Sequence, residues 1–212
     1  MKSPNLYTNK SLISFFSLCA ICILTVLSFN PLLAQHGQVE VQISAGTDDA
    51  EENLSSGGVA HNSSDLELVT DGSAQLVGMR FQSINIPQGA RIVSAYIEFE
   101  CDEVGSSSAT TLTISGEAID DASTFVAASN NISSRIKTSA TTPWNISGTW
   151  VVNSKYKTSN FGPVVEEIVG RSGWSANNDM VIMIGGSGQR IVESYDGEVA
   201  AAPKLVVVYD NV

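Results

Sequence analysis

Residues Arg91 to Cys101 read RIVSAYIEFEC, and this stretch decides the fold class. Apolar and polar side chains alternate along it, with Val93, Ala95, Ile97, Phe99 and Cys101 in one set and Ser94, Glu98 and Glu100 in the other. Successive side chains of a β-strand point to opposite faces of the sheet, so this alternation is typical of a sheet with one buried face and one exposed to water. The stretch therefore predicts a strand of an antiparallel sheet, with the apolar set facing the core.

Similar short runs recur along the chain, separated by clusters of Gly, Ser, Asn and Asp. They are VEVQIS (39–44), DLELV (65–69), QLVGMRF (75–81), TLTISGEA (111–118), MVIMIG (180–185), QRIVESY (189–195) and KLVVVYD (204–210). This pattern predicts an all-β, antiparallel sandwich or barrel of about nine strands. MVIMIG is almost wholly apolar and is expected to be a central strand. In TLTISGEA, the pattern places Leu112 and Ile114 inside, and Ser115 and Glu117 outside.

Two segments depart from the strand pattern. SNFGPVVEEIVGRSGW (159–174) predicts one short helix, with Ser159 or Asn160 as its cap and Pro163 in its first turn. Its apolar stripe should plug one end of the sandwich. Residues 120–142 have weak periodicity and many Ser, Thr and Asn, and they predict a long connection over the surface.

Residues 1–34 have the three-part pattern of a secretory signal peptide. A polar start with two lysines precedes the apolar run SLISFFSLCAICILTVLSF, and Pro31 and Ala34 follow before Gln35. The alternative is an uncleaved membrane anchor, because a bilayer span needs roughly 20 apolar residues. We expect cleavage, a secreted or cell-surface location, and a single domain over residues 35–212 with no membrane span.

Charge and cysteine content limit the function further. Loss of Lys2 and Lys10 with the leader changes the formal net charge from −11 to −13. Such acidity argues against nucleic-acid binding, which depends on Lys and Arg at phosphates. Only Cys101 remains after cleavage, so no internal disulfide can form.

A family resemblance rests on SDLELVTDGSAQLVGMRFQSINIPQGARIVSAYIEFECDE (64–103) and on the closing ESYDGEVAAAPKLVVVYD (193–210). These segments resemble DNRLRE-type domains, which are related to disaggregatase repeats. The resemblance implies a jelly-roll β-sandwich of the carbohydrate-binding-module type. It also implies a secreted protein of the class in which some members bind acidic polysaccharide. No binding residue is carried over, because no ligand motif maps onto this chain.

The segment GTDDAEENL (46–54) concentrates carboxylates, with no Lys or Arg within ten residues on either side. Hard cations such as Ca²⁺ take six to eight oxygens from carboxylates and loop carbonyls. We interpret the segment as a loop that is either solvated or part of a structural calcium site. The candidate ligands are Asp48, Asp49, Glu51, Glu52 and Asp196.

Three aromatic residues near the long connection are candidates for a sugar-stacking platform. Trp144 and Trp150 lie in TPWNISGTWVV, and Tyr156 follows shortly after. Tryptophans in such positions also commonly cover the edge of a core. Both interpretations stay open, whereas Trp174, just after the helix, is expected in the core.

Catalysis has little support in the sequence. There is no phosphate loop, HExxH or paired CxxC, and GGSGQ around Ser187 departs from GxSxG at its last position. Glycosidases need only two carboxylates, for which Asp102-Glu103 and Asp120-Asp121 are formal candidates. We therefore expect a non-enzymatic module that binds extracellular or cell-surface polysaccharide. The alternatives are a subunit of a coat or fibre that self-associates through edge strands such as QHGQVEVQIS, and, less favoured, a small glycan-active hydrolase or lyase.

Overall fold

The computed structural model describes residues 36–105 and 109–210. The predicted leader lies outside the described residues. Within them the chain forms thirteen strands, one α-helix and two 3₁₀ helices. The larger strand number arises because several strands are only two or three residues long, and because the acidic segment, expected as a loop, contains a strand.

The longer strands are β1 (His36–Gln42), β2 (Asp49–Asn53), β6 (Ser73–Ile84), β7 (Arg91–Glu100), β8 (Thr110–Gly116), β9 (Thr142–Ile146), β11 (Asn178–Ser187) and β13 (Lys204–Asp210). The short strands are β3 (Val59–Ala60), β4 (Asp65–Glu67), β5 (Thr70–Asp71), β10 (Lys155–Lys157) and β12 (Ile191–Glu193). The helices are α1 (Gly162–Val169) and the 3₁₀ helices η1 (Gly46–Asp48) and η2 (Val199–Ala201).

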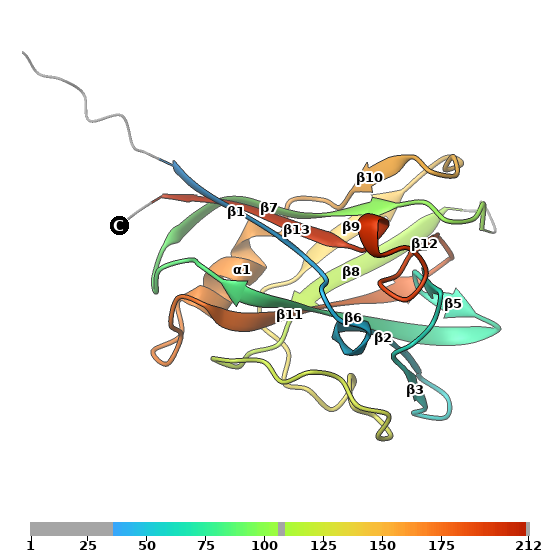
Figure 1. Ribbon diagram of the computed structural model, residues 1–212, viewed down its shortest axis with the longest axis horizontal. Coiled ribbons are helices and arrows are strands. Elements are labelled where there is room, and N and C mark those ends of the chain that lie inside the picture. Colours follow the sequence, from blue (N-terminus) through green and yellow to red (C-terminus); the bar gives the residue numbers. More distant parts are fainter. Residues whose placement is uncertain (1–35, 106–108, 211–212) are drawn as a thin grey trace, which may run out of the picture. The chain divides into compact units, whose positions relative to one another are not determined.

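The strands form an antiparallel β-sandwich (Figure 1). One sheet has the order β1-β13-β7-β10, and the larger sheet has the order β3-β2-β6-β11-β8-β9, with β5 beside β6. Without β2, β3 and β5, the two orders are β1-β13-β7-β10 and β6-β11-β8-β9. That is the eight-stranded order of a jelly roll, in which the chain repeatedly crosses between the sheets. The predicted fold class is confirmed, and β11 is a central strand as expected.

The main core lies between the sheets and follows the period of two. From β7 it takes Ala95, Ile97 and Phe99, as predicted, but Val93 is exposed. The pairing with β13 shifts register at Val208, which leaves Val93 as an extra residue. Such a bulge turns the following side chains to the other face. It explains why the simple alternation is wrong at this one position.

A second apolar cluster, here called the outer cluster, lies on the other face of the larger sheet. It consists of Ala50, Leu76, Ala122, Phe125, Ile132, Val181 and Met183. Residues 118–141 cross this face and contribute three of its members. The connection is therefore packed on the sheet, and it buries Ser115 and Glu117, which the alternation placed in water.

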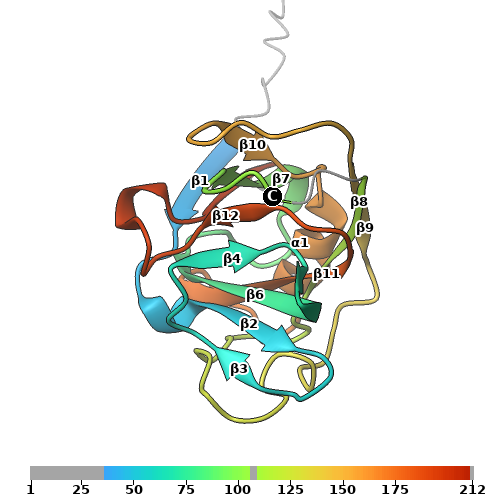
Figure 2. The same ribbon diagram turned by 90° about the vertical axis from the view of Figure 1, so that its right-hand side faces the viewer.

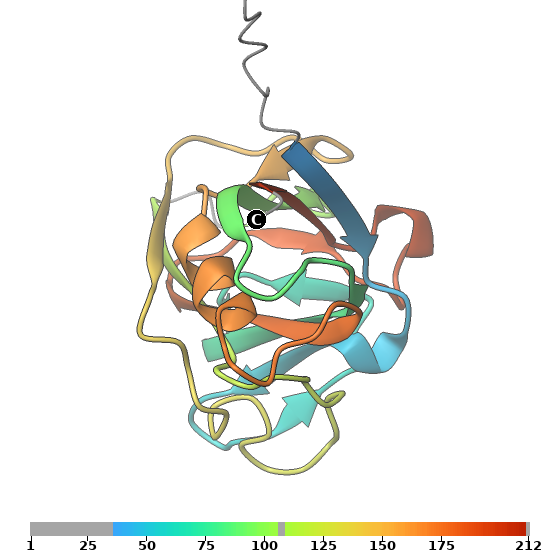
Figure 3. The same cartoon turned by 90° about the vertical axis from the view of Figure 1, so that its left-hand side faces the viewer.

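Different elements close the two ends of the sandwich. Helix α1 packs on β7 and β8 at one end (Figure 3), with Val164, Val165 and Ile168 in the main core. Its N-cap residue is Phe161, which follows both predicted caps, although Asn160 Oδ1 does accept the N–H of Gly162 at 2.9 Å. At the other end, the β4–β12 pair lies between the two sheets (Figure 2).

The one α-helix of the described residues is short. No helix in residues 36–105 and 109–210 has the length and apolar character needed to cross a membrane.

Candidate functional site

The acidic segment is a buried strand rather than an exposed loop. β2 pairs with β6 along its length, so its side chains alternate between the two faces of the larger sheet. Glu51 lies opposite Val77, which belongs to the main core, whereas Glu52 lies opposite Leu76, which belongs to the outer cluster. The predicted calcium ligands Glu51 and Glu52 therefore lie on opposite faces of the larger sheet.

Asp48 is held by an arginine. Its side chain is 0% exposed, and Oδ1 lies 2.7 Å from Nη1 of Arg80 on β6. Thr124 Oγ1 donates to the same oxygen at 3.1 Å, and Gln82 Nε2 donates to Oδ2. Asp48 is fully engaged by protein groups, so it supplies no free oxygen to a metal.

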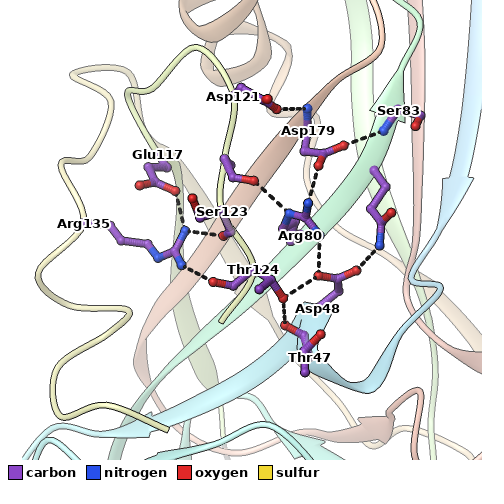
Figure 4. A network of polar contacts seen from close by, with 12 residues as sticks. Thr47, Asp48, Arg80, Ser83, Glu117, Asp121, Ser123, Thr124, Arg135 and Asp179 are labelled. Atoms are coloured by element: carbon purple, nitrogen blue, oxygen red, sulfur yellow. Dashed lines mark hydrogen bonds and ion pairs between the residues drawn. The ribbon is translucent and has the colours of Figure 1, made fainter. Parts of the chain in front are cut away.

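Arg80 is also the centre of a wider network, which fixes the 118–141 connection (Figure 4). Its Nε donates to the carbonyl of Ala122 at 2.8 Å, and its Nη2 pairs with Asp179. Beside it, Arg135 Nη1 donates to Glu117 Oε2 at 2.6 Å and to the carbonyl of Ser123 at 2.9 Å. The network joins the connection to β6, to β11 and to Glu117, which directly follows β8, and its role is structural.

Glu52 supports the same connection from the outer face. Its Oε2 accepts the backbone N–H groups of Ile132 and Ser133 at 2.7 and 2.8 Å. Its Oε1 is buried without a hydrogen-bond partner. Glu52 is thus separated by the sheet from Asp49 and Glu51, which lie on the inner face.

Asp49 and Asp196 are the predicted ligands that come near each other. Asp49 Oδ2 accepts the N–H of Tyr195 at 2.8 Å. Burial, reinforced by the charge of Asp196, raises the pKa of Asp49 to about 7. Across residues 36–105 and 109–210, no group of three or more His, Cys, Asp or Glu is positioned to hold a metal ion. The five residues therefore do not assemble into the single site that we expected.

Glu51 lines a pocket of about 370 Å³ at the β4 end of the sandwich. We call it the β2–β4 pocket, and it is lined by Glu51, Asn53, Gly58, Val59, Ala60, Ser63, Glu67, Asp71 and Gln75. Glu51 Oε1 accepts the backbone N–H of Glu67 at 2.6 Å, which ties β2 to β4. Its polar residues come from β2, β4, β5 and β6 and from the segment between β3 and β4.

The carboxyl groups of Glu51 and Glu67 are hydrogen-bonded to each other. Burial and this bond raise the pKa of Glu51 to about 9. Burial also raises the pKa of Glu67, and the charges of Asp65 and Asp71 add to the effect. Two carboxyls in such contact share a proton, because two negative charges at that distance repel strongly.

Gln75 on β6 supplies an unusual group in the pocket lining. It lies opposite Asn53 in the β2–β6 register and is only 7% exposed. Its Oε1 is buried without a hydrogen-bond partner. Asn53, in contrast, is satisfied, since its amide donates to Ser73 Oγ at 2.6 Å and its Oδ1 accepts the N–H of Ser55 at 3.0 Å. A buried acceptor without a donor is rare in native proteins.

The three aromatic candidates are together, but inside the protein. Trp150 stacks on Tyr156 with ring centroids 4.1 Å apart, and Trp144 stacks on Phe99 at 5.9 Å. Trp144 and Trp150 are 5% and 6% exposed, and Tyr156 packs against the main core. Sugar stacking needs an open ring face, so the structure does not provide the predicted platform at these residues. Trp174 is in the core as predicted.

The carboxylate pairs considered for catalysis have other partners. Asp120 Oδ1 lies 2.6 Å from Arg171 Nε, and Asp121 Oδ1 accepts the N–H of Asp179 at 2.8 Å. Asp102 is hydrogen-bonded to Glu193, and burial, together with the charge of Asp102 and this bond, raises the pKa of Glu193 to about 7. None of these arrangements presents two separated carboxyls across a cleft.

A smaller cavity of about 90 Å³ lies on the outer face of the four-stranded sheet. Lys155 Nζ lies 3.1 Å from Glu98 Oε1, and Lys204 Nζ lies 3.8 Å from the same oxygen. Its charges are therefore balanced within the protein. The β2–β4 pocket is the better candidate site.

Sequence reasoning selected Glu51 but missed Glu67, Asp71 and Gln75. The signal for Glu51 was present, because DAEEN has the alternation of a strand, with Asp49 and Glu51 on one side. Nothing local links that strand to Glu67 or Gln75, since their proximity depends on pairing and on the β4 crossing.

Comparisons with known proteins leave the family open. A scan against protein-family models finds no match to this chain, and a search of curated proteins finds no similar sequence. The resemblance to DNRLRE-type domains thus stays a prediction.

Proposed function

We propose that this chain is a secreted, non-catalytic β-sandwich module that binds an extracellular or cell-surface polysaccharide in the β2–β4 pocket. The observation that carries the proposal is the pocket itself, most of whose lining residues have hydrogen-bonding side chains. A volume of about 370 Å³ suits a sugar residue, since small-molecule sites are roughly 300–1,000 Å³.

The chemistry of the lining favours a hydroxyl-bearing ligand. Six of the nine lining residues have hydrogen-bonding side chains, namely Glu51, Asn53, Ser63, Glu67, Asp71 and Gln75. Gly58 and Ala60 are small and leave room for a ligand ring. No aromatic side chain lines this pocket, so recognition would rest on hydrogen bonds rather than on stacking.

Carboxyl spacing supports binding over hydrolysis. Glycosidases hold their two carboxyls about 5–9.5 Å apart to admit the sugar and water. Glu51 and Glu67 are instead hydrogen-bonded to each other. A pair in direct contact leaves no room for a scissile bond between its members.

The test is a glycan array with the purified protein, with and without calcium, followed by calorimetry on the best ligand. Gln75→Leu should lower affinity at least ten-fold, because it removes a hydrogen-bonding amide from the pocket lining. Glu103→Gln, on an exposed residue outside the pocket, is the matched control. Absence of binding to every glycan class, or equal binding by both variants, would contradict the proposal.

A second candidate is self-association into a coat or fibre, favoured by the position of β1. In the described part of the chain, β1 pairs with β13 on one side and lies at the edge of its sheet. Edge strands offer unpaired backbone groups to another chain. Concentration-dependent polymer in light scattering, together with no glycan signal, would favour this candidate over the first.

A further inference from the structure

We infer that β1 pairs edge to edge with β1 of a second copy of this chain, in an antiparallel register centred on Val39, and so forms a closed two-fold dimer. The inference goes beyond the proposed function, because the pairing needs no glycan. It follows from the outward backbone groups of β1, from the open core beside it, from the charges along it and from the protection of the other sheet edges.

Alternate residues of β1 direct their backbone polar groups away from the protein. β1 pairs with β13 in an unbroken register along its length. The N–H of Ile43, just after β1, donates to the carbonyl of Pro203 at 3.0 Å. Because bonded pairs alternate in an antiparallel ladder, the odd-numbered residues of β1 are the ones that bond to β13. The backbone groups of Gln38 and Glu40 therefore point outward, and residues 36–105 and 109–210 supply no partner for them.

The main core is open along β1. Val39 and Val41 pack against it but are only partly buried. Val207 and Leu205, which lie directly opposite them on β13, are 0% exposed. Removal of apolar surface from water favours association. Pairing with a second β1 would cover these two valines.

The side chains of β1 favour one register. With the pairing centred on Val39, Gln38 of one copy lies opposite Glu40 of the other, and Val41 lies opposite Gly37, which has no side chain to obstruct it. Gln38 Nε2 donates to Glu40 Oε1 of its own chain at 2.7 Å. An amide has two N–H donors, so it can donate to the carboxylate of the second copy as well. Centring the pairing on Glu40 instead would place two like charges face to face, which destabilises a strand pair.

Repulsion between two copies is small at this edge. The whole chain has a formal net charge of −11, but Glu40 is the one formal charge of β1 when His36 is neutral. Glu40 Oε2 lies 3.3 Å from Lys204 Nζ, which offsets that charge within each copy. An acidic protein can therefore approach itself along β1 at little electrostatic cost.

The other sheet edges of the described residues are poorly suited to pairing. β10 has three residues, and both of its lysine side chains are more than half exposed. β9 contains Pro143, which has no N–H, and β3 has two residues. Short strands, lysines and proline all hinder edge-to-edge pairing. Since β1 uses the same surface on both copies, the assembly closes at two chains and does not continue as a fibre.

The η2 segment limits the length of the pairing. Gln42 Nε2 donates to the carbonyls of Ala200 and Ala202 at 3.1 and 2.9 Å. This segment thus lies beside the last residue of β1 (Figure 2). Pairing from Gly37 to Val41 of each copy remains open to a second chain.

The test is sedimentation velocity of the purified protein over a range of concentrations, where we expect a monomer–dimer equilibrium. Gln38→Glu should weaken the dimer about ten-fold, because both symmetry-related contacts with Glu40 become repulsive. Gln88→Glu makes the same chemical change on the exposed loop between β6 and β7, and it should leave the dimer intact. The double variant Gln38→Glu/Glu40→Gln exchanges the two side chains at unchanged net charge, so it should restore the dimer. Thermal melts check that each variant folds.

Hydrogen exchange followed by NMR tests the same pairing residue by residue. The amides of Val39 and Val41 should be protected at every concentration, because they bond to β13 within each copy. The amides of Gln38 and Glu40 should become protected only as the dimer forms. Protection of all four amides in the monomer would show that the edge is already covered and would overturn the inference.

The remaining outcomes are also decisive. A monomer at every concentration overturns the inference, and so does equal weakening by Gln38→Glu and Gln88→Glu or a double variant that fails to dimerise. Growth beyond two chains overturns it and favours the coat or fibre.

The inference and the proposed function fail separately. Glycan binding by a strict monomer would contradict the dimer and leave the proposed function standing. A dimer with no glycan signal would do the reverse. If both hold, the dimer presents two β2–β4 pockets to one polysaccharide, so Gln38→Glu should weaken binding to long chains more than to short ones.

Discussion

Nη1 of Arg80 lies 2.7 Å from Oδ1 of Asp48, and this pair joins β6 to the 3₁₀ helix that precedes β2. The side chain of Asp48 is 0% exposed and that of Arg80 is 15% exposed. The pair explains why an acidic stretch with no nearby basic residue in sequence is stable in the interior. The compensating charge comes from a strand 32 positions away.

Loss of this arginine should be costly. Arg80→Met leaves Asp48 as an unpaired buried charge, and removing one partner of a buried pair typically costs about 3–5 kcal/mol. Urea unfolding followed by circular dichroism measures the loss. Arg91, which is 67% exposed and pairs with Asp210, is the control, and Arg91→Gln should cost less than about 1 kcal/mol. Equal losses would contradict the structural role of Arg80.

The outer cluster should contribute to the stability of the protein as a hydrophobic core does. Phe125 is 1% exposed and packs with Ile132 and Met183, so Phe125→Ala should lower the free energy of unfolding by about 3–5 kcal/mol. The neighbouring Val126 is 47% exposed, and Val126→Ala should change it by less than about 0.5 kcal/mol. Chemical denaturation of both variants compares them. A small loss for Phe125→Ala would mean that the connection is only loosely attached.

Stability should fall as pH rises through the neutral range. Burial raises the pKa of Asp49 from 3.8 to about 7, so the folded state holds this proton more tightly than the unfolded chain. Its contribution is fully present below pH 4, is lost as pH rises to about 7, and then levels off. Over this range the contribution of Asp49 to the free energy of unfolding falls by up to about 4 kcal/mol. Glu193, with its pKa also raised to about 7, acts in the same direction.

Urea unfolding between pH 4 and 8 measures this slope. Asp49→Asn should reduce it, because the amide has no proton to lose, while Glu51 and Glu193, whose pKa values are also raised, keep the rest of the slope. Glu103→Gln should leave the slope as in the parent protein. A slope unchanged by Asp49→Asn would show that other groups cause the pH dependence.

Chelation should leave the melting temperature unchanged within about 1 °C. Asp48 is held by Arg80 and Glu52 by backbone N–H groups, and the five ligands expected from sequence do not come together in the described residues. Differential scanning calorimetry in excess calcium and in EDTA measures this. A rise of several degrees in calcium would instead favour an ion at Asp49 and Asp196, and Asp196→Asn should then abolish the rise.

The sequence was informative where one face of an element is apolar. The alternation in RIVSAYIEFEC and the stripe Val164, Val165 and Ile168 identify a strand and a helix correctly. It failed at Val93, because the bulge depends on pairing with β13. It failed at Glu117 and left Trp144 open between a sugar platform and the edge of the core, because coverage by other segments, rather than residue type, decides whether such side chains are exposed.

By itself, the sequence determined an all-β antiparallel sandwich with one short helix, because hydrophobic periodicity is local and burial of one face follows from it directly. Only the tertiary structure decided where the acidic side chains lie and which residues form the pocket. Strand pairing sends Glu51 and Glu52 to opposite faces, brings Arg80 to Asp48, and gathers Glu67 and Gln75 around Glu51. These contacts join residues far apart in the chain, and their electrostatics depend on distance and burial, which a linear pattern does not contain.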